Sequence, residues 1–125
     1  MAKIVIVDDS RLARTFTASC LRKLGHEVEV TEPTSIFDVV KVLREIRPDL
    51  LIMDFLMPNC PGTSLAKVVG DDSDLKGMRT IVLTAHHDED VVARLQDLGV
   101  AEVLFKPADP EALGRAVAEA LATRT

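Results

Sequence analysis

The chain has 125 residues, a length typical of a single domain, and its formal net charge is −5 at pH 7. A hydrophobic content of 47% supports an ordinary core and excludes disorder as the overall state. The acidic balance and the lack of a basic stripe argue against nucleic acid as a partner of this domain, and no apolar run is long enough for a membrane span.

The N-terminus and the cysteines favour a cytoplasmic location. The apolar stretch that begins at Ile4 already ends at Asp8, so it is too short for a signal peptide. Cys20 and Cys60 are too few for a disulfide framework and are interpreted as reduced thiols. We therefore expect a cytoplasmic protein in which residues 1–125 form one domain, without a linker or an internal repeat.

The first strand and helix are expected near the N-terminus. Residues 4–7 form a continuously apolar run, which is typical of a strand covered on both faces of a parallel sheet. Ser10 is placed to cap the helix that follows. The apolar residues of this helix recur four positions apart, at Leu12, Phe16 and Cys20, and this stripe is expected to face the core.

The second strand is predicted at an edge of the sheet. Residues 28–30 alternate with glutamates, as expected of a strand with one face in water. The second helix is expected to begin at Thr34 or Ser35 and to end before Pro48. Residues 50–53 then form another continuously apolar run and predict the third strand.

Two further strands and three further helices complete the pattern. A third helix is expected around residues 64–69, and the runs 81–83 and 103–105 predict the fourth and fifth strands. A fourth helix is expected over residues 88–99. Asp109 is followed by a proline, the combination typical of a cap and the first position of a helix, and predicts where the fifth helix begins.

This alternation of strand and helix predicts an α/β fold. The arrangement is (βα)5, a doubly wound parallel five-stranded sheet. If residues 28–30 form one edge and residues 103–105 the other, the strand order is the flavodoxin-like 2-1-3-4-5. In such a sheet, ligands bind at the carboxyl ends of the strands, so the residues at those ends are the candidates for function.

Polar residues stand at the ends of four of the five strands. Asp8 and Asp9 follow the first strand, Asp54 the third, Thr84 the fourth and Lys106 the fifth. Each residue alone has an ordinary structural explanation, such as a helix cap, a turn or a solvated charge. Their convergence on one rim of one sheet is hard to obtain by chance and indicates a functional site.

The residue types at this rim indicate phosphoryl chemistry. Carboxylates that lie close together stay ionised only if a cation offsets their charge, and all-oxygen ligation suits Mg²⁺ rather than zinc. Lys106 and the hydroxyl of Thr84 are suited to stabilise phosphoryl oxygens. Asp54, at the centre of the sheet, is the natural nucleophile and would form an acyl phosphate.

At this point the chain resembles the receiver (response regulator) domain of two-component signal transduction. The resemblance covers essentially all of the chain and favours a stand-alone, single-domain type with no output domain in this chain. The matching residues are Val7-Asp8-Asp9-Ser10 with Arg14, Asp54-Phe55-Leu56-Met57-Pro58 with Gly62, Leu83-Thr84-Ala85, Leu98-Gly99 and Phe105-Lys106-Pro107.

The resemblance implies a role for each residue of the rim. It implies that Asp54 is the phosphoacceptor, and that Asp9, Asp54 and the backbone carbonyl of Leu56 bind Mg²⁺ directly while Asp8 binds it through water. It implies that Thr84 binds the phosphoryl group and moves on activation. It also implies that Lys106 is the phosphoryl cation and is followed by a cis bond to proline.

The function implied by the resemblance is that of a phosphoacceptor signalling module. A histidine kinase or a phosphotransfer protein supplies the phosphoryl group, and the module then changes the surface that it offers to a downstream protein partner. In this sense the chain is not an enzyme, because it catalyses only its own aspartyl phosphorylation and dephosphorylation.

Two features of the sequence depart from the usual receiver pattern. Receivers commonly carry an aromatic residue or a histidine three positions before the lysine, where this chain has Val103. We therefore expect activation to be read on the fourth helix, fifth strand and fifth helix without an aromatic rotamer. Leu56 and His86 occupy the two positions that flank the path of the hydrolytic water, and we expect them to set the lifetime of the phosphoryl group.

Two other functions compete with this one. A haloacid-dehalogenase-like phosphatase also uses a strand-end aspartate and Mg²⁺, but it needs a second aspartate two residues after the nucleophile. Here Ser10, Arg11 and Leu56 occupy the corresponding positions. The third hypothesis is a receiver-like scaffold that signals without phosphate, and Val103 is the feature that supports it.

Three further motifs are given structural interpretations. The acidic stretch 70–74 lacks the later ligands of a calcium loop and is expected to be a solvated loop. His86 and His87 are adjacent, unlike the metal-binding pairs of a zinc helix, and are expected to lie in a turn. Cys60 is interpreted as a small loop residue rather than a redox thiol.

Overall fold

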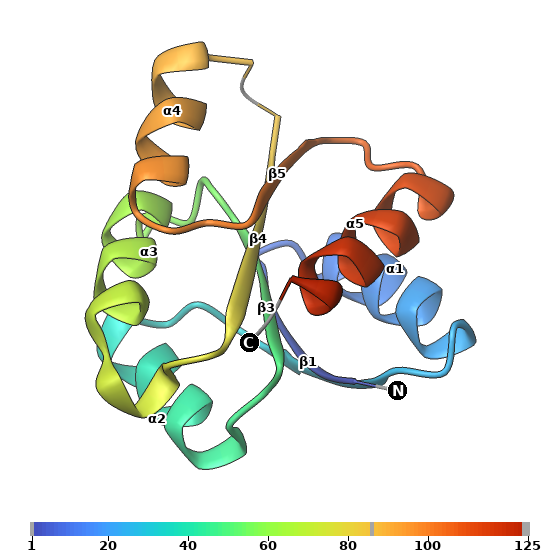
Figure 1. Cartoon of the computed structure of the whole chain (residues 1–125), viewed down its shortest axis with the longest axis horizontal. Helices are drawn as coiled ribbons and strands as arrows, with labels where there is room; N and C mark the ends of the chain where they lie inside the picture. Colours follow the sequence, from blue (N-terminus) through green and yellow to red (C-terminus); the bar gives the residue numbers. More distant parts are fainter. Residues whose placement is uncertain (1, 86, 124–125) are drawn as a thin grey trace.

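A computed structural model describes residues 2–85 and 87–123 and gives the predicted α/β architecture (Figure 1). One sheet of five parallel strands has the order β2-β1-β3-β4-β5, which confirms the flavodoxin-like prediction. The strands are β1 (Lys3–Val7), β2 (Glu27–Thr31), β3 (Leu50–Asp54), β4 (Arg79–Thr84) and β5 (Glu102–Phe105).

Helices cover both faces of the sheet. In Figure 1, α1 and α5 lie on one side and α2, α3 and α4 on the other. The helices are α1 (Arg11–Lys23), α2 (Ile36–Ile46), α3 (Gly62–Asp71), α4 (Glu89–Asp97) and α5 (Pro110–Ala122), and a 3₁₀ turn, η1, spans Ser73–Leu75. In the described part of the chain, no helix has the length and apolar character needed to cross a membrane.

The core has two layers because alternate residues of a strand point to opposite faces. Ile4 and Ile52 are buried under α1 and α5, whereas Val5 and Leu51 are buried under α2, α3 and α4. Both layers are fully enclosed at the central strands, which explains why the runs 4–7, 50–53 and 81–83 within β1, β3 and β4 are continuously apolar.

Side-chain caps begin four of the five helices. Ser10 accepts a hydrogen bond from the Ala13 amide, and Ser35, rather than Thr34, caps α2. Asp88 and Asp109 cap α4 and α5 in the same way. Helix α3 follows Pro61, has no side-chain cap, and extends beyond the predicted 64–69 at both ends. The missing cap explains why the sequence underestimated its length.

Only one residue of the predicted apolar stripe of α1, Cys20, packs against the core, and the other two lie at the surface. Leu12 is 81% exposed and Phe16 is 52% exposed, and the buried face instead consists of Arg14, Thr17, Ala18 and Leu21. This face has the i, i+3, i+4, i+7 spacing of a helix that packs on a sheet. Ala18 and Leu21 on this face pack in the core, and Arg14 on the same face donates a hydrogen bond to the backbone carbonyl of Asp8.

The register of the strands aligns their carboxyl ends. Val7 pairs with Met53, Asp54 with Leu83, and Thr84 with Phe105. Asp54 and Thr84 are therefore the last residues of their strands, and the residues that follow β1 and β5 meet them at the same rim.

A glycine holds the segment after Asp54 close to α3. The amide of Gly62 donates a hydrogen bond to the carbonyl of Phe55 over 3.1 Å. A Cβ atom at Gly62 would lie 2.7 Å from that oxygen and 2.9 Å from the Phe55 Cα, both of which are backbone atoms. Only glycine permits this approach, which fixes the path of the chain directly after the central aspartate.

We predict that Gly62→Ala destabilises the fold by about 1–3 kcal/mol, because the added methyl group must displace backbone. The matched control is Gly114→Ala in α5, where the nearest atom is the end of the flexible Leu24 side chain. That change should be neutral or stabilising by up to about 1 kcal/mol, since alanine favours helix. Urea unfolding followed by circular dichroism measures both; equal effects would contradict the steric explanation.

Candidate functional site

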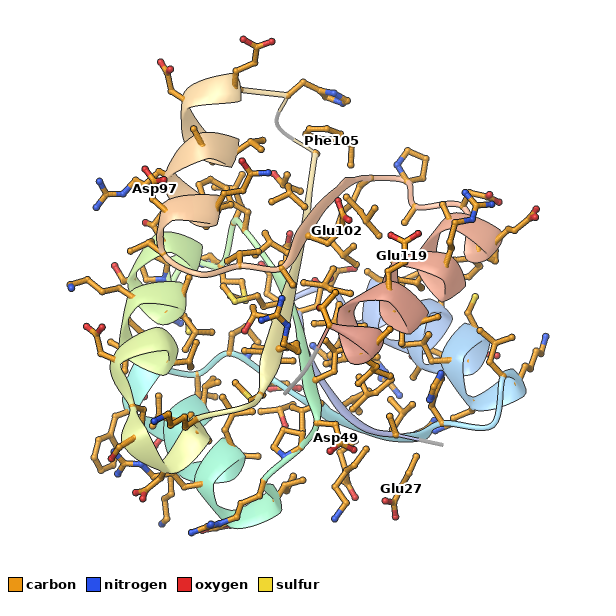
Figure 2. All side chains as sticks on the ribbon, viewed as in Figure 1. Glu27, Asp49, Asp97, Glu102, Phe105 and Glu119 are labelled. Atoms are coloured by element: carbon orange, nitrogen blue, oxygen red, sulfur yellow. The ribbon has the colours of Figure 1, made fainter. Side chains whose placement is uncertain are left out.

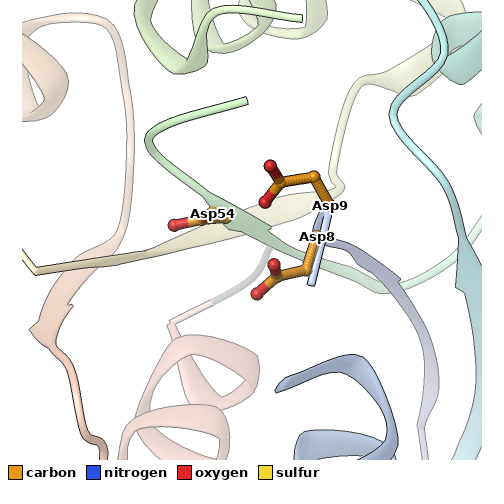
Figure 3. Close-up of side chains that lie close together, drawn as sticks. All are labelled: Asp8, Asp9 and Asp54. Carbon is orange, nitrogen blue, oxygen red and sulfur yellow. The ribbon is translucent and has the colours of Figure 1, made fainter. Parts of the chain in front are cut away.

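Three carboxylates meet at the carboxyl ends of β1 and β3. One carboxylate oxygen from each of Asp8, Asp9 and Asp54 lies within 4.8 Å of the other two, and Figure 3 shows the three side chains together. Asp8 and Asp54 are buried, whereas Asp9 is exposed. The structure thus brings together the three aspartates that the sequence placed at this rim.

Lys106 bridges two of these carboxylates. Its Nζ lies 3.1 Å from Asp8 Oδ2 and 3.2 Å from Asp54 Oδ1. Burial alone would lower the pKa of the Lys106 ammonium, but its hydrogen bonds and ion pairs with Asp8 and Asp54 outweigh burial and raise it. The ammonium form of Lys106 is thus favoured at this rim, and its one positive charge against three carboxylates leaves the cluster with a formal excess of two negative charges.

The Asp54 carboxylate is held in an unfavourable environment. Burial raises the pKa of this carboxyl above its ordinary value, and the charge of Asp8 raises it further. Lys106 and the backbone amide of Phe55 stabilise the ionised form but do not fully offset these effects. A buried carboxylate beside another carboxylate favours the arrival of a cation.

Hydrogen bonds fix the orientation of Asp8. Its Oδ1 accepts from the Ser10 amide over 2.9 Å, and its Oδ2 faces Lys106. The buried Arg14 donates to its backbone carbonyl over 2.6 Å and forms a 3.5 Å ion pair with Glu32, just beyond β2. In the sequence, Arg14 was noted only as part of the match to the receiver motif. One feature of the sequence could have indicated its role: Arg14 stands at helical spacing from Ala18 and Leu21, on the face that the structure buries.

Thr84 and Leu56 occupy different environments at the rim. Thr84 is 1% exposed, and its backbone carbonyl accepts a hydrogen bond from the Lys106 amide over 2.8 Å. This bond ties the end of β4 to the residue after β5. The bond between Lys106 and Pro107 is cis, as the resemblance implied. Leu56 lies two residues beyond Asp54 with its side chain largely exposed.

The structure describes Val103 but not His86, two of the residues that depart from the receiver pattern. Val103 is buried in the core layer under α2, α3 and α4. His86 lies outside the described residues. Its neighbour His87 is exposed, and its ring stacks on the ring of Phe105 with 4.1 Å between centroids. This stack was not predicted, because it joins a residue outside the sheet to a strand residue 18 positions away in sequence.

Two of the motifs interpreted structurally behave differently from each other. The acidic stretch 70–74 is not simply a loop. It contains the end of α3 and the start of η1, and Asp72 pairs with Arg44 at 2.8 Å. Asp72 also caps η1, Asp74 lies 3.8 Å from Arg44, and Asp71 pairs with Lys67 in α3, so each of the three aspartates has a structural partner. Cys60 is fully buried, and burial raises the pKa of its thiol, which makes the thiolate less available.

The donor set of the aspartate cluster fits a hard divalent cation. All of its candidate ligand atoms are carboxylate oxygens, which suits Mg²⁺ and disfavours zinc. A divalent ion would also match the formal excess of two negative charges that Lys106 leaves. A phosphoryl group attached at Asp54 would lie near both this ion and the Lys106 ammonium.

An apolar groove of about 510 Å³ adjoins the cluster. Leu12 and Phe16 of α1 form one wall, and Pro107, Ala108 and Leu113 form the other. Ser10 and Lys106 also line it, so the groove opens directly onto the functional rim. The exposed stripe of α1 that the sequence assigned to the core thus forms part of this surface.

Comparisons with known proteins agree with this geometry. Residues 4–118 match the family model described as the response regulator receiver domain. The chain is 30% identical to Protein PilH of Pseudomonas aeruginosa over 122 residues, which cover 98% of this chain and 99% of that protein. The structure of the chemotaxis response regulator CheY4 of Vibrio cholerae superposes with a TM-score of 0.86 at 28% identity, covering 96% of this chain and 98% of that one.

A longer relative contains the same unit as one part. The chain is 32% identical over 117 residues to the CAI-1 autoinducer sensor kinase/phosphatase CqsS of Vibrio cholerae. The match covers 93% of this chain but only 17% of that protein.

We predict that Asp54→Asn raises the melting temperature at neutral pH in EDTA. Because the pKa of Asp54 is raised on folding, the folded protein loses stability as pH rises from about 4, where unfolded aspartate ionises, through the raised value. Asparagine does not titrate, so the advantage of the variant should grow over this range and then level off. Thermal melts between pH 4 and 8 measure it.

The matched control is Glu45→Gln, which removes an exposed carboxylate of α2. Because this side chain is exposed, the variant should melt as wild type does at neutral pH. An Asp54→Asn variant that melts at or below the wild-type temperature at neutral pH would contradict the electrostatic account.

Proposed function

The chain belongs to the family of response regulator receiver domains of two-component signalling, and from this premise we propose that Asp54 is its phosphoacceptor, with Mg²⁺ as cofactor. A histidine kinase or a phosphotransfer protein is the proposed donor. The observation that carries the proposal is the convergence of Asp8, Asp9 and Asp54 with Lys106 at one rim. As in the family, the module acts on a downstream protein partner.

The three aspartates are proposed to bind the metal in two different ways, directly or through a water molecule. Asp9 and Asp54, with the carbonyl of Leu56, are the proposed direct ligands. Asp8 already accepts hydrogen bonds on both carboxylate oxygens, from Ser10 and Lys106, which supports binding through a water molecule instead. Mg²⁺ keeps several waters in most protein sites, so this arrangement suits it. When bound, the ion neutralises carboxylate charge and polarises phosphoryl oxygens.

The transfer step needs one nucleophile and one stabilising cation from the chain. A carboxylate oxygen of Asp54 forms a bond to phosphorus while the bond from phosphorus to the donor nitrogen breaks, and the donor imidazole keeps that electron pair. Lys106, now 3.2 Å from Asp54, is placed to bind a phosphoryl oxygen. The Thr84 hydroxyl is the proposed second donor to the phosphoryl group.

The surface beside the site supports a protein as donor. A phosphohistidine must reach Asp54 over the rim, and the apolar groove between Leu12, Phe16 and Pro107 lies along that approach. Exposed apolar side chains next to a reactive group are typical of a docking surface. We therefore place the donor protein over α1 and the segment that leads into α5.

The phosphoryl signal is proposed to spread along β4 and β5. Phosphorylation adds negative charge beside Thr84, and a hydroxyl drawn toward that charge moves the segment that leads into α4. The surface of α4, β5 and α5 is the proposed site of the downstream contact. With Val103 buried and without a ring, this change proceeds without an aromatic rotamer at that position.

The phosphatase and scaffold hypotheses are both less well supported than the phosphoacceptor. The match over residues 4–118 assigns the chain to the receiver family, so nothing favours a haloacid-dehalogenase-like phosphatase. The module then acts only on its own acyl phosphate. A receiver-like scaffold that works without phosphate would have no need of a carboxylate cluster with a bridging lysine. The intact cluster therefore supports phosphorylation over the scaffold.

We predict that acetyl phosphate with Mg²⁺ adds one phosphoryl group to the wild-type protein, seen as a mass increase of the intact chain. Asp54→Asn should abolish the adduct, because the nucleophile is gone. EDTA should abolish it as well, because the carboxylates then lack a counter-ion. Asp38→Asn, on the exposed surface of α2, is the matched control and should be phosphorylated normally. An adduct that persists in Asp54→Asn would sink the assignment.

We predict that Asp9→Ala weakens Mg²⁺ binding about ten-fold or more, whereas Lys106→Ala leaves it unchanged or tightens it. Asp9 supplies a ligand, but the Lys106 ammonium pairs with the same carboxylates and so competes with the metal. Because the chain has no Trp and no Tyr, calorimetry or amide chemical shifts are the suitable measurements.

Lys67→Ala is the control for the loss of a lysine, since Lys67 pairs with Asp71 on the exposed surface of α3. It should bind Mg²⁺ as wild type does. Equal losses of metal affinity in Asp9→Ala and Lys106→Ala would contradict the separate roles of these two residues.

A further inference from the structure

A stacked pair of rings links the segment before α4 to the end of β5. The imidazole of His87 lies over the phenyl ring of Phe105, with 4.1 Å between ring centroids and 16° between ring planes. His87 follows Thr84 by three residues, and Phe105 directly precedes Lys106. Figure 2 shows Phe105 at this end of the sheet, where β4 leads toward α4. The stack therefore spans the two strand ends that carry Thr84 and Lys106.

The two partners of the stack are anchored unequally. Phe105 pairs with Thr84 in the sheet, and the next residue, Lys106, is held by the Thr84 carbonyl and by two carboxylates. His87 lies outside the sheet, and the following residue, Asp88, caps α4 within its own segment. A displacement of the segment before α4 would therefore move the imidazole, while the phenyl ring stays with β5.

Phe105 also lies on the same face of β5 as Val103, because the two residues are two positions apart in a strand. Val103 is buried in the core, whereas Phe105 is 38% exposed and lies one step nearer to the phosphoryl site. The aromatic side chain on this face of β5 thus stands at the end of the strand, next to Lys106, and the imidazole of His87 covers part of its ring.

We propose that the His87–Phe105 stack is a latch that holds the segment before α4 in its unphosphorylated position, with His87 as a positioning residue. The latch rests on the proposed phosphorylation of Asp54. When the Thr84 hydroxyl is drawn toward the phosphoryl group, the segment that contains His87 moves with it and the imidazole leaves the phenyl face. Phe105 then becomes an exposed apolar contact on the surface of α4, β5 and α5.

The latch predicts how much loss of the stack changes the affinity for a phosphoryl mimic. An interaction present in one state only shifts the balance toward that state, so the stack opposes binding of any ligand that stabilises the activated state. Aromatic pairs contribute modestly beyond the area that they bury. Loss of the stack should therefore tighten the binding of a phosphoryl mimic by about two- to ten-fold.

The experiment is a titration of Mg²⁺-loaded protein with beryllofluoride, followed by amide and aromatic NMR signals. His87→Ala and Phe105→Leu should each bind the mimic about two- to ten-fold more tightly than wild type. His87→Phe keeps a stacked ring and should bind as wild type does. Phe37→Leu makes the same chemical change as Phe105→Leu on the exposed surface of α2, far from the stack, and should also match wild type.

A second readout separates the latch from a general effect on the site. The Phe105 ring protons of wild type should lose the ring-current shift of His87 when beryllofluoride binds, and in His87→Ala that shift should be absent from the start. Unchanged or weaker affinity in His87→Ala, or Phe105 signals that ignore beryllofluoride, would overturn the latch alone. Wild-type protein that binds no beryllofluoride in Mg²⁺ would overturn the phosphoacceptor function and the latch together.

Discussion

The three carboxylates at the carboxyl ends of β1 and β3 repel one another, and the neighbouring residues must offset this repulsion. Asp8, Asp9 and Asp54 lie close enough to share one ion, and two of them are buried, where charge is costly. The fold keeps them together because Lys106 pairs with the two buried members. Lys106 offsets only part of the negative charge of the three carboxylates. The charge that remains favours a divalent cation, for which a fully neutralised cluster would have little affinity.

The parallel sheet is what makes such a cluster possible. In a parallel sheet all carboxyl ends share one edge, so residues that are far apart in sequence meet there without a dedicated loop. Asp8 and Lys106 are separated by 98 positions yet form an ion pair, because β1 and β5 both end at this rim. Arg14 extends the arrangement: it links the backbone of Asp8 to Glu32, and so connects β1, α1 and the end of the edge strand β2.

Most of the fold and the centre of the site could be predicted from sequence, because the signals are local. Continuous apolar runs mark β1, β3 and β4, Ser10, Ser35, Asp88 and Asp109 mark helix starts, and the polar residues at the strand ends mark the rim. The strand order followed from the alternation of strand and helix and from the choice of the two edges.

The features that could not be predicted depend on contacts between distant residues. Arg14 lies on the buried face of α1, where its partner is a backbone carbonyl that no periodicity reveals. The stripe of Leu12 and Phe16 had the right spacing for a core face, yet it lines an open groove. The His87–Phe105 stack depends on the pairing of Thr84 with Phe105, which fixes where each strand ends relative to the other.

The contacts around the rim differ in strength. Asp8 is held by Ser10, Arg14 and Lys106, and Lys106 is held in turn by the end of β4. His87, which lies between β4 and α4, touches β5 through a ring stack, a contact that is weaker and less directional than charge-assisted hydrogen bonds. The proposed phosphoryl group at Asp54 would add negative charge beside both sets of contacts, and the ring stack would cost less to break than the hydrogen bonds of Asp8 and Lys106. On that proposal, the unequal strength of these contacts directs the signal from the carboxylates toward α4 and the exposed end of β5.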